Sequence, residues 1–216
     1  TPPPGSAGTN TSFSLTIMDN ACPIPGQQTI IYNINVLPKT YAGLDRTICL
    51  GSSTQLHATG GGTSYTWSVI SGDPIVVGTN FSCNNCDSPV ASPVTTTAYQ
   101  VTGNSGTCVN IDTVVVSVAP SFTYNLTQSS TNSCLLQPVQ LNVSNVSPAG
   151  SYSYAWSPST YLDNATIANP IATITSPGSY TYTVTVSNSQ GCVKVDSIII
   201  NVIAAVSPNI TAYSDT

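Results

Sequence analysis

Charge is scarce in this sequence. Its 216 residues contain eight aspartates, no glutamate and three basic residues, Lys39, Arg46 and Lys194. An average globular chain carries roughly 25% charged residues. Three scattered cations cannot neutralise a row of phosphates, which excludes nucleic acid and anionic membranes as partners. Solubility therefore depends on the uncharged polar residues Ser, Thr, Asn and Gln.

The residues that best form exposed helices are also nearly missing. Besides the absent glutamate there is one methionine, whereas Val, Ile, Thr and Tyr are abundant, which is an all-β composition. The 40% hydrophobic content argues against disorder. No window approaches the roughly 20 apolar residues of a membrane span, and the start, TPPPGSAG, lacks the features of a signal peptide. We expect no direct membrane insertion, and we interpret the chain as an internal piece of a longer protein.

The sequence repeats. Two alternating runs around a turn and a cysteine occur at 14–38, 97–120 and 181–205. The last two are preceded by matching segments: CLGSSTQL (49–56) with CLLQPVQL (134–141), SYTWSV (64–69) with SYAWSP (153–158), and SPVA (88–91) with NPIA (169–172). The repeats predict the end of one domain (1–37), two complete domains (38–119 and 120–204) and the start of another (205–216).

Each complete repeat has the pattern of a β-sandwich. Its short strands alternate with period 2, and a tryptophan lies on the third strand, which favours an immunoglobulin-like fold. The residues expected to face inward are Leu56, Tyr65, Trp67, Tyr99, Val101, Val114, Val116 and Val118, then Leu141, Tyr152, Tyr154, Trp156, Tyr182, Val184, Ile198, Ile200 and Val202.

Four of the seven cysteines recur at matching positions. Cys49 and Cys108 are 59 residues apart, and Cys134 and Cys192 are 58 apart. This spacing predicts one disulfide within each repeat, which would contribute on the order of 4 kcal/mol by the loop-entropy model. Cys22 matches the hairpin cysteines, and its partner is expected upstream of Thr1. Persistent disulfides imply an oxidising compartment outside the cytoplasm.

The remaining pair lies in the motif CNNCDSP (83–89). A disulfide between Cys83 and Cys86 is favoured, because the second repeat has Asn164 and Ile167 at these positions and so does without the pair. Zinc bound by the four cysteines of this repeat and redox-active thiols are the alternatives. A redox pair needs a basic neighbour or helix end to lower a thiol pKa, and the stretch offers neither.

No catalytic centre is indicated. His57 is the only histidine and alternates with apolar neighbours, as an outward-facing strand residue does. Without a second histidine or any glutamate, no repeated nucleophile and base can be assembled, so we predict no enzyme and no required cofactor. Calcium is the one candidate ion, at Asp45 near a repeat junction; turn and cap roles are the alternative for the aspartates. Tyr41, Tyr161 and Tyr213 are candidates for stacking on sugars, with packing as the alternative.

A family resemblance covers nearly the whole chain. AGLDRTICLGSSTQL (42–56), YTWSV, CNNCDSPVASPVTTTAYQVT and CVNIDTVVVSV resemble Ig-like or PKD-like repeats of giant Bacteroidota surface proteins, including gliding-motility adhesins exported by type IX secretion. YAWSPSTYLDNATIANPIA and GCVKVDSIIINV are similar to them too, but SFTYNLTQSSTNSC lacks the Ala-Gly-x-Asp opening. Asp112-Thr113-Val114 and Asp196-Ser197-Ile198 look like the triplets at which these bacteria attach O-glycans, which makes Thr113 and Ser197 candidate glycosylation sites.

The resemblance implies an adhesive filament at the cell surface, anchored to the outer membrane. Its partners would be neighbouring repeats, extracellular surfaces or polysaccharides, and the outer-membrane export and motility machinery. Short proline-containing connections at 37–40, 119–122 and 204–208 favour a semi-rigid, extended rod that acts as a stalk. The alternatives are a carbohydrate-binding module array of a secreted polysaccharide-degrading enzyme and a structural envelope or sheath protein.

Overall fold

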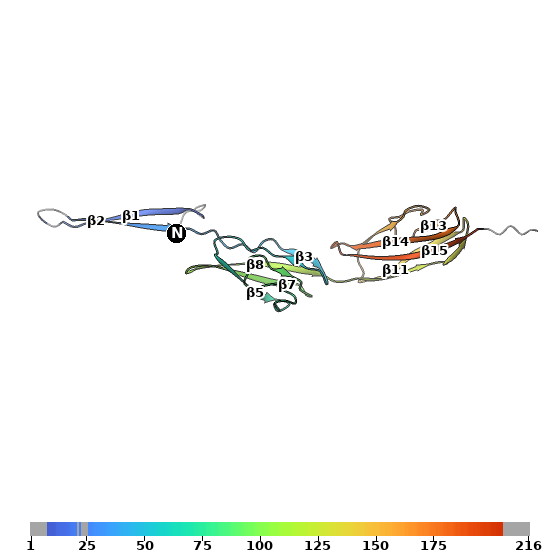
Figure 1. Cartoon of the computed structure of the whole chain (residues 1–216), viewed down its shortest axis with the longest axis horizontal. Coiled ribbons are helices and arrows are strands. Elements are labelled where there is room, and N and C mark those ends of the chain that lie inside the picture. Colours follow the sequence, from blue (N-terminus) through green and yellow to red (C-terminus); the bar gives the residue numbers. More distant parts are fainter. Residues whose placement is uncertain (1–7, 21, 23–25, 205–216) are drawn as a thin grey trace, which may run out of the picture. The chain divides into compact units, whose positions relative to one another are not determined.

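The computed structural model describes residues 8–20, 22 and 26–204, and its secondary structure consists of fifteen β-strands. None of these residues forms a helix long and apolar enough to cross a bilayer. The chain divides into two compact units, Thr1–Val118 and Ala119–Thr216 (Figure 1). The division lies next to the predicted boundary at 119/120. The separate domains predicted at 1–37 and 205–216 stay predictions, and the latter segment lies outside the described residues.

A two-stranded hairpin begins the described chain. Strands β1 (Asn10–Met18) and β2 (Gln27–Asn35) pair antiparallel with Phe13 opposite Tyr32. The alternation gathers Phe13, Leu15, Ile17 and Tyr32 on one face, where the rings of Phe13 and Tyr32 stack with centroids 5.1 Å apart. None of the residues in the two strands is buried. The hairpin therefore has an apolar face of the kind that the complete repeats bury.

The rest of the first unit is a two-sheet sandwich. The larger sheet has the order β3 (Arg46–Cys49), β8 (Cys108–Ala119), β7 (Thr97–Ser105) and β5 (Ser64–Ser71), and the smaller pairs β4 (Thr54–Gln55) with β6 (Val90–Ala91). Its core contains Leu56, Trp67, Tyr99, Val101, Val114 and Val116, all predicted to face inward. Tyr65 and Val118 pack at its margin.

Two features of this core do not follow from strand alternation. Phe81, in an irregular segment, is 1% exposed and contacts Tyr99 with ring centroids 5.2 Å apart. Gly103 interrupts the inward row on β7 because Thr40, itself buried, passes over it. A Cβ at Gly103 would lie 2.2 Å from the Thr40 hydroxyl oxygen, so only glycine permits this approach.

The second unit repeats the two-sheet sandwich, and its smaller sheet has three strands where that of the first unit has two. One sheet has the order β10 (Asn132–Cys134), β15 (Val193–Ile203), β14 (Gly178–Asn188) and β12 (Tyr152–Ser157), and the other the order β13 (Ile171–Thr173), β11 (Pro138–Ser147) and β9 (Thr123–Gln128). The predicted inward residues Leu141, Trp156, Tyr182, Val184, Ile200 and Val202 are buried. Strand β9 pairs with β11 although the segment lacks the opening motif of the first repeat.

Candidate cross-link and modification sites

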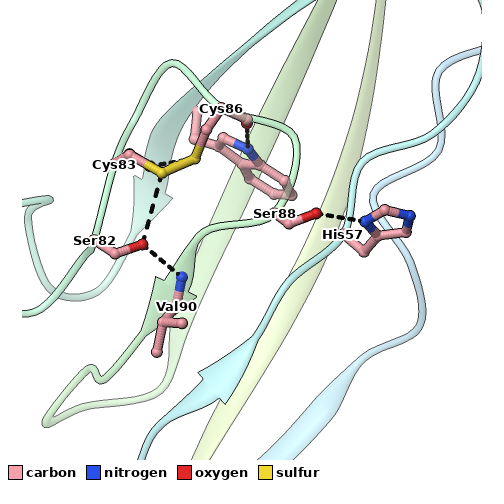
Figure 2. The surroundings of a disulfide bond; sticks show 7 residues. His57, Ser82, Cys83, Cys86, Ser88 and Val90 are labelled. Atoms are coloured by element: carbon pink, nitrogen blue, oxygen red, sulfur yellow. Dashed lines mark hydrogen bonds between the residues drawn. A yellow bond between two sulfur atoms is a disulfide. The ribbon is translucent and has the colours of Figure 1, made fainter.

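The CNNC motif forms a loop over the tryptophan of the first unit. Cys83 and Cys86 are joined in a disulfide with their Cα atoms 6.0 Å apart, as the sequence predicts (Figure 2). Beneath it, the indole Nε1 of Trp67 donates to the Cys86 carbonyl at 2.9 Å, and the Trp67 backbone N donates to the Asn84 carbonyl at 2.7 Å. Because both sulfurs are joined in one bond, the loop offers no thiolate ligands to zinc in this state.

The second unit builds the same contact without cysteine. The Trp156 indole donates to the Ile167 carbonyl at 2.9 Å, and the Trp156 backbone N donates to the Ala165 carbonyl at 2.8 Å. Asn164 replaces Cys83 and holds the turn by accepting from the backbone N of Thr166 at 2.9 Å. Both loops therefore place a backbone carbonyl where it accepts a hydrogen bond from the indole of the core tryptophan. A disulfide holds the loop in the first unit, and a side-chain hydrogen bond to Asn164 holds it in the second.

His57 and Ser88 lie beside this loop (Figure 2). The His57 side chain is exposed, as predicted, but the residue lies after the end of β4 at Gln55 and not in the strand that was expected. Its Nδ1 is 2.7 Å from the Ser88 hydroxyl. Within the described residues no group orients the other ring nitrogen, and the corresponding positions of the second unit are Asn142 and Asn169. The His57–Ser88 contact is therefore a feature of the first unit that the second unit does not repeat.

The prediction of a disulfide between Cys134 and Cys192 within the second unit is wrong. Strand β10 runs parallel to β15, and Cys134 lies beside Ile203, the last residue of β15. Cys192 immediately precedes the first residue of β15, Val193. Eleven residues of extended strand separate Cys192 from Ile203, a distance of about 36 Å, whereas a disulfide needs Cα atoms within about 7 Å. In agreement, Cys134 is an exposed free thiol.

The prediction of a disulfide between Cys49 and Cys108 within the first unit is wrong for the same reason. Asp45 accepts from the backbone N of Val115, and the backbone N of Ala42 donates to Asp112, so the segment leading into β3 runs parallel to β8. Cys49 therefore lies beyond Val115 along β8. Cys108 is the first residue of β8, about 23 Å before Val115 along the strand. Cys108 is also an exposed free thiol. The exposed thiol of Cys22 is free as well, and its predicted partner remains a prediction.

The two candidate glycosylation residues lie on exposed strand faces. Thr113 on β8 is opposite Gln100, and Ser197 on β15 is opposite Thr183; both side chains are exposed. The preceding aspartates differ in their contacts. Asp112 accepts from the Ala42 backbone N at 2.9 Å, and Asp196 accepts from the Ser197 backbone N at 2.8 Å. The hydroxyls are accessible to an enzyme, and their modification stays a prediction.

The aspartates act as acceptors for backbone groups. Asp45 binds the Val115 backbone N at 2.8 Å, and Asp163 binds that of Ile171 at 2.8 Å. Hydrogen bonds from the Thr95 hydroxyl and from the Val94 and Thr95 backbone lower the pKa of Asp73. Within the described ranges no three or more His, Cys and Asp side chains gather as a metal site would require. A calcium role for Asp45 remains an untested expectation.

The three tyrosines considered for sugar stacking differ in placement. Tyr41 is 47% exposed and pairs with Thr59 through its backbone. The ring of Tyr161 packs edge-on against Tyr180 with centroids 5.7 Å apart, and Tyr213 lies outside the described residues. A packing role accounts for Tyr161.

Comparisons with known proteins establish the fold. No family model matches the sequence, and no curated protein is found as a relative. The structure of the eight N-terminal Ig domains of Down Syndrome Cell Adhesion Molecule aligns with a TM-score of 0.54 at 13% identity, covering 90% of this chain. This chain spans 28% of that structure. Extracellular domains 3–5 of Drosophila OTK align with a TM-score of 0.47 at 10% identity, covering 84% of this chain and 70% of that one. The chain thus consists of tandem Ig-like β-domains, as predicted.

Proposed function

We propose that this chain is a non-catalytic repeat region of a large cell-surface adhesin or gliding-motility filament, exported by type IX secretion and anchored to the outer membrane. In this role the Ig-like units form a stalk that carries an adhesive surface away from the cell or contacts surfaces itself. Its partners are neighbouring repeats, extracellular surfaces or polysaccharides, and the export and motility machinery.

The length of the connection between units carries this proposal. Strand β8 ends at Ala119 and β9 begins at Thr123, which leaves three residues, one of them Pro120. A connector of this length has little conformational freedom, and proline restricts it further. An Ig-like unit repeated through such connectors transmits displacement along the chain, as a stalk must.

The surface chemistry also supports an extracellular repeat. With 5% charged residues, contacts along such a stalk depend little on salt, because few ion pairs are present to be screened. The buried side chains of both units are almost all apolar, and the polar exceptions are Thr40, Thr97 and Ser133. Charged side chains are therefore almost missing from both the core and the surface, which fits a repeat whose contacts are made by uncharged groups.

Immunogold labelling tests the proposed location and shape. Antibodies against residues 38–204 are expected to label intact, unpermeabilised producing cells, and antibody fragments are expected to reduce attachment to glass or polysaccharide. Electron micrographs of the native protein should show extended fibres. Labelling that requires permeabilisation, or compact particles in the micrographs, would refute the role. A catalytic domain in the rest of the reading frame would instead favour a carbohydrate-binding module array.

Glycosylation of Thr113 and Ser197 is part of the same proposal. Peptides covering these residues, prepared from native material, are expected to carry added hexose mass that Thr113→Ala and Ser197→Ala abolish. Thr66→Ala is the matched control, because Thr66 is an exposed strand threonine without a preceding aspartate. Unmodified mass for both peptides would reject the sites.

A further inference from the structure

One edge of the larger sheet in the second unit is only partly covered. Strand β15 lies between β10 and β14, but β10 pairs only with Asn201–Ile203 at the end of β15. Along Val193–Ile200 no strand of the described chain pairs with this side of β15. The backbone groups of an uncovered strand are available to another strand, so this part of β15 is an open edge.

The first unit covers the equivalent edge with its own chain. Residues 42–49 run parallel to β8, and the Ala42 backbone N donates to the Asp112 carboxylate at 2.9 Å. The Asp45 carboxylate accepts from the Val115 backbone N at 2.8 Å. Ala42 is only 1% exposed in this position. The covering segment therefore provides a small residue and, three residues later, an aspartate that binds the edge.

In the second unit the matching stretch of sequence lies on the other sheet. Alignment of the first cysteines of the two repeats places Thr127 at the position of Ala42 and Ser130 at that of Asp45. Thr127 belongs to β9 and pairs with Asn142 of β11. Ser130 has no carboxylate to bind the edge. Because this repeat lacks the Ala-Gly-x-Asp opening, the part of β15 that such a segment would cover is left free.

The open edge is visible in the exposure of equivalent residues. An offset of 84 residues matches Val114 of β8 with Ile198 of β15, and Val115 with Ile199. Val114 is 1% exposed, whereas Ile198 is half-buried. Val115 is half-buried, whereas Ile199 is 48% exposed. Both differences have the direction expected if a covering segment is missing from the second unit.

A groove lies along the start of the open edge. Its volume is about 520 Å³, and it is lined by Thr123, Tyr124, Lys194, Val195 and Asp196. Asp196 is the counterpart of Asp112, and its carboxylate accepts from the adjacent Ser197 backbone N at 2.8 Å. The carboxylate that binds the covering segment in the first unit therefore faces open space in the second.

Further along the edge, a side chain occupies the place of a strand. The Gln128 Nε2 donates to the Ile199 carbonyl at 2.9 Å. The Oε1 of the same amide is buried and has no hydrogen-bond partner among the described residues. A buried acceptor without a donor is costly, and the backbone N–H groups of an added strand are the kind of donor that it lacks.

We propose that β15 binds an extended segment of another polypeptide as an added parallel strand, in the place that residues 42–49 take in the first unit. The bound segment has a small residue beside Asp196 and an aspartate three residues later beside Ile199. It continues the parallel ladder that β10 already forms with the end of β15. Main-chain hydrogen bonds provide the affinity, and the two carboxylates fix the register. The inference depends on the fold of the second unit and not on an adhesive role.

A peptide with the sequence TYAGLDRTI (40–48) is the probe for this edge. In the 216-residue protein the first unit already holds its own copy of this segment, so we expect fluorescence anisotropy to show saturable binding of one labelled peptide per chain. Loss of either carboxylate, by Asp45→Ala in the peptide or Asp196→Ala in the protein, should weaken binding about tenfold or more. Asp87→Ala, which removes an exposed aspartate from the first unit, is the control and should leave the affinity unchanged.

NMR of the same complex locates the peptide and its direction. Amide hydrogen exchange at Ser197 and Ile199 should become slower when the peptide binds. A nitroxide at the peptide N-terminus should broaden the signals of Lys194 more than those of Asn201, because the added strand is parallel. The proposal is overturned by the absence of saturable binding at millimolar peptide, by unchanged exchange along β15, or by stronger broadening at Asn201. Equal affinity of the protein and its Asp196→Ala variant would also overturn it.

Discussion

Removal of the Cys83–Cys86 disulfide gives a quantitative test of the loop over Trp67. The bond closes a loop of three residues' separation. For so short a loop, the loop-entropy relation gives a loss of about 2 kcal/mol at 25 °C when the cross-link is removed. We expect Cys83→Ser/Cys86→Ser to lower the unfolding free energy of the first unit by this amount and to leave the second unit unchanged.

Urea unfolding followed by tryptophan fluorescence measures the effect. In a Trp156→Phe background the sole indole is Trp67, which is 2% exposed and hydrogen-bonded to the loop. For a unit of this size the urea slope is about 1–2 kcal/mol/M, so the midpoint should fall by about 1–2 M. Cys108→Ser, which removes an exposed free thiol, is the control and should not shift the midpoint.

Two outcomes would refute this reasoning. A loss below about 0.5 kcal/mol would mean that the carbonyl contact with Trp67 holds the loop without the cross-link. An equal loss in the second unit, read from Trp156 in a Trp67→Phe background, would mean that the cysteines act beyond their own loop.

Two further predictions concern the first unit. Gly103→Ala should lower the unfolding free energy by about 1–3 kcal/mol, because the added Cβ would overlap Thr40. Gly150→Ala, in the second unit, is the control: its Cβ would have its nearest atom at 3.6 Å, so thermal unfolding should be nearly unchanged. Equal melting temperatures for the two variants would contradict the overlap. The folded-state pKa of Asp73 is lowered from 3.8, chiefly by the hydrogen bond from the Thr95 hydroxyl. The ionised carboxylate therefore stabilises the folded state at pH values above 3.8, and this stabilisation is lost as the pH falls through the lower folded-state pKa. Asp73→Asn should therefore flatten the acid limb of a urea-midpoint against pH curve, and an unchanged limb would exclude the effect.

The sandwich core was readily predicted from the sequence. Residues such as Trp67, Tyr99 and Val101 are buried because alternation along a strand places every second side chain on one face, and period is a local property of the chain. The match between the two loops was also predictable, since Asn84 and Ala165 make the same contact at equivalent repeat positions. Phe81 was not, because it lies in an irregular segment where no period indicates a face.

The cysteine pairings could not be predicted because they depend on strand direction. A spacing of 59 or 58 residues says that two cysteines recur together, but it carries no information on whether a short first strand runs parallel or antiparallel to the last. In the second unit a three-residue strand, β10, decides the question. Such a strand is too short to show a period of its own.

The β1–β2 hairpin has a practical consequence for laboratory work. Among the residues that the structure describes, it is a two-stranded ribbon with two free edges and an uncovered row of side chains that includes Phe13, Leu15 and Ile17. Ribbons of this kind are marginal in water and recruit strands from other molecules. Preparations that retain it should self-associate as they are concentrated, whereas those that begin at residue 38 should remain monodisperse, so solution measurements on the sandwiches are best made without it.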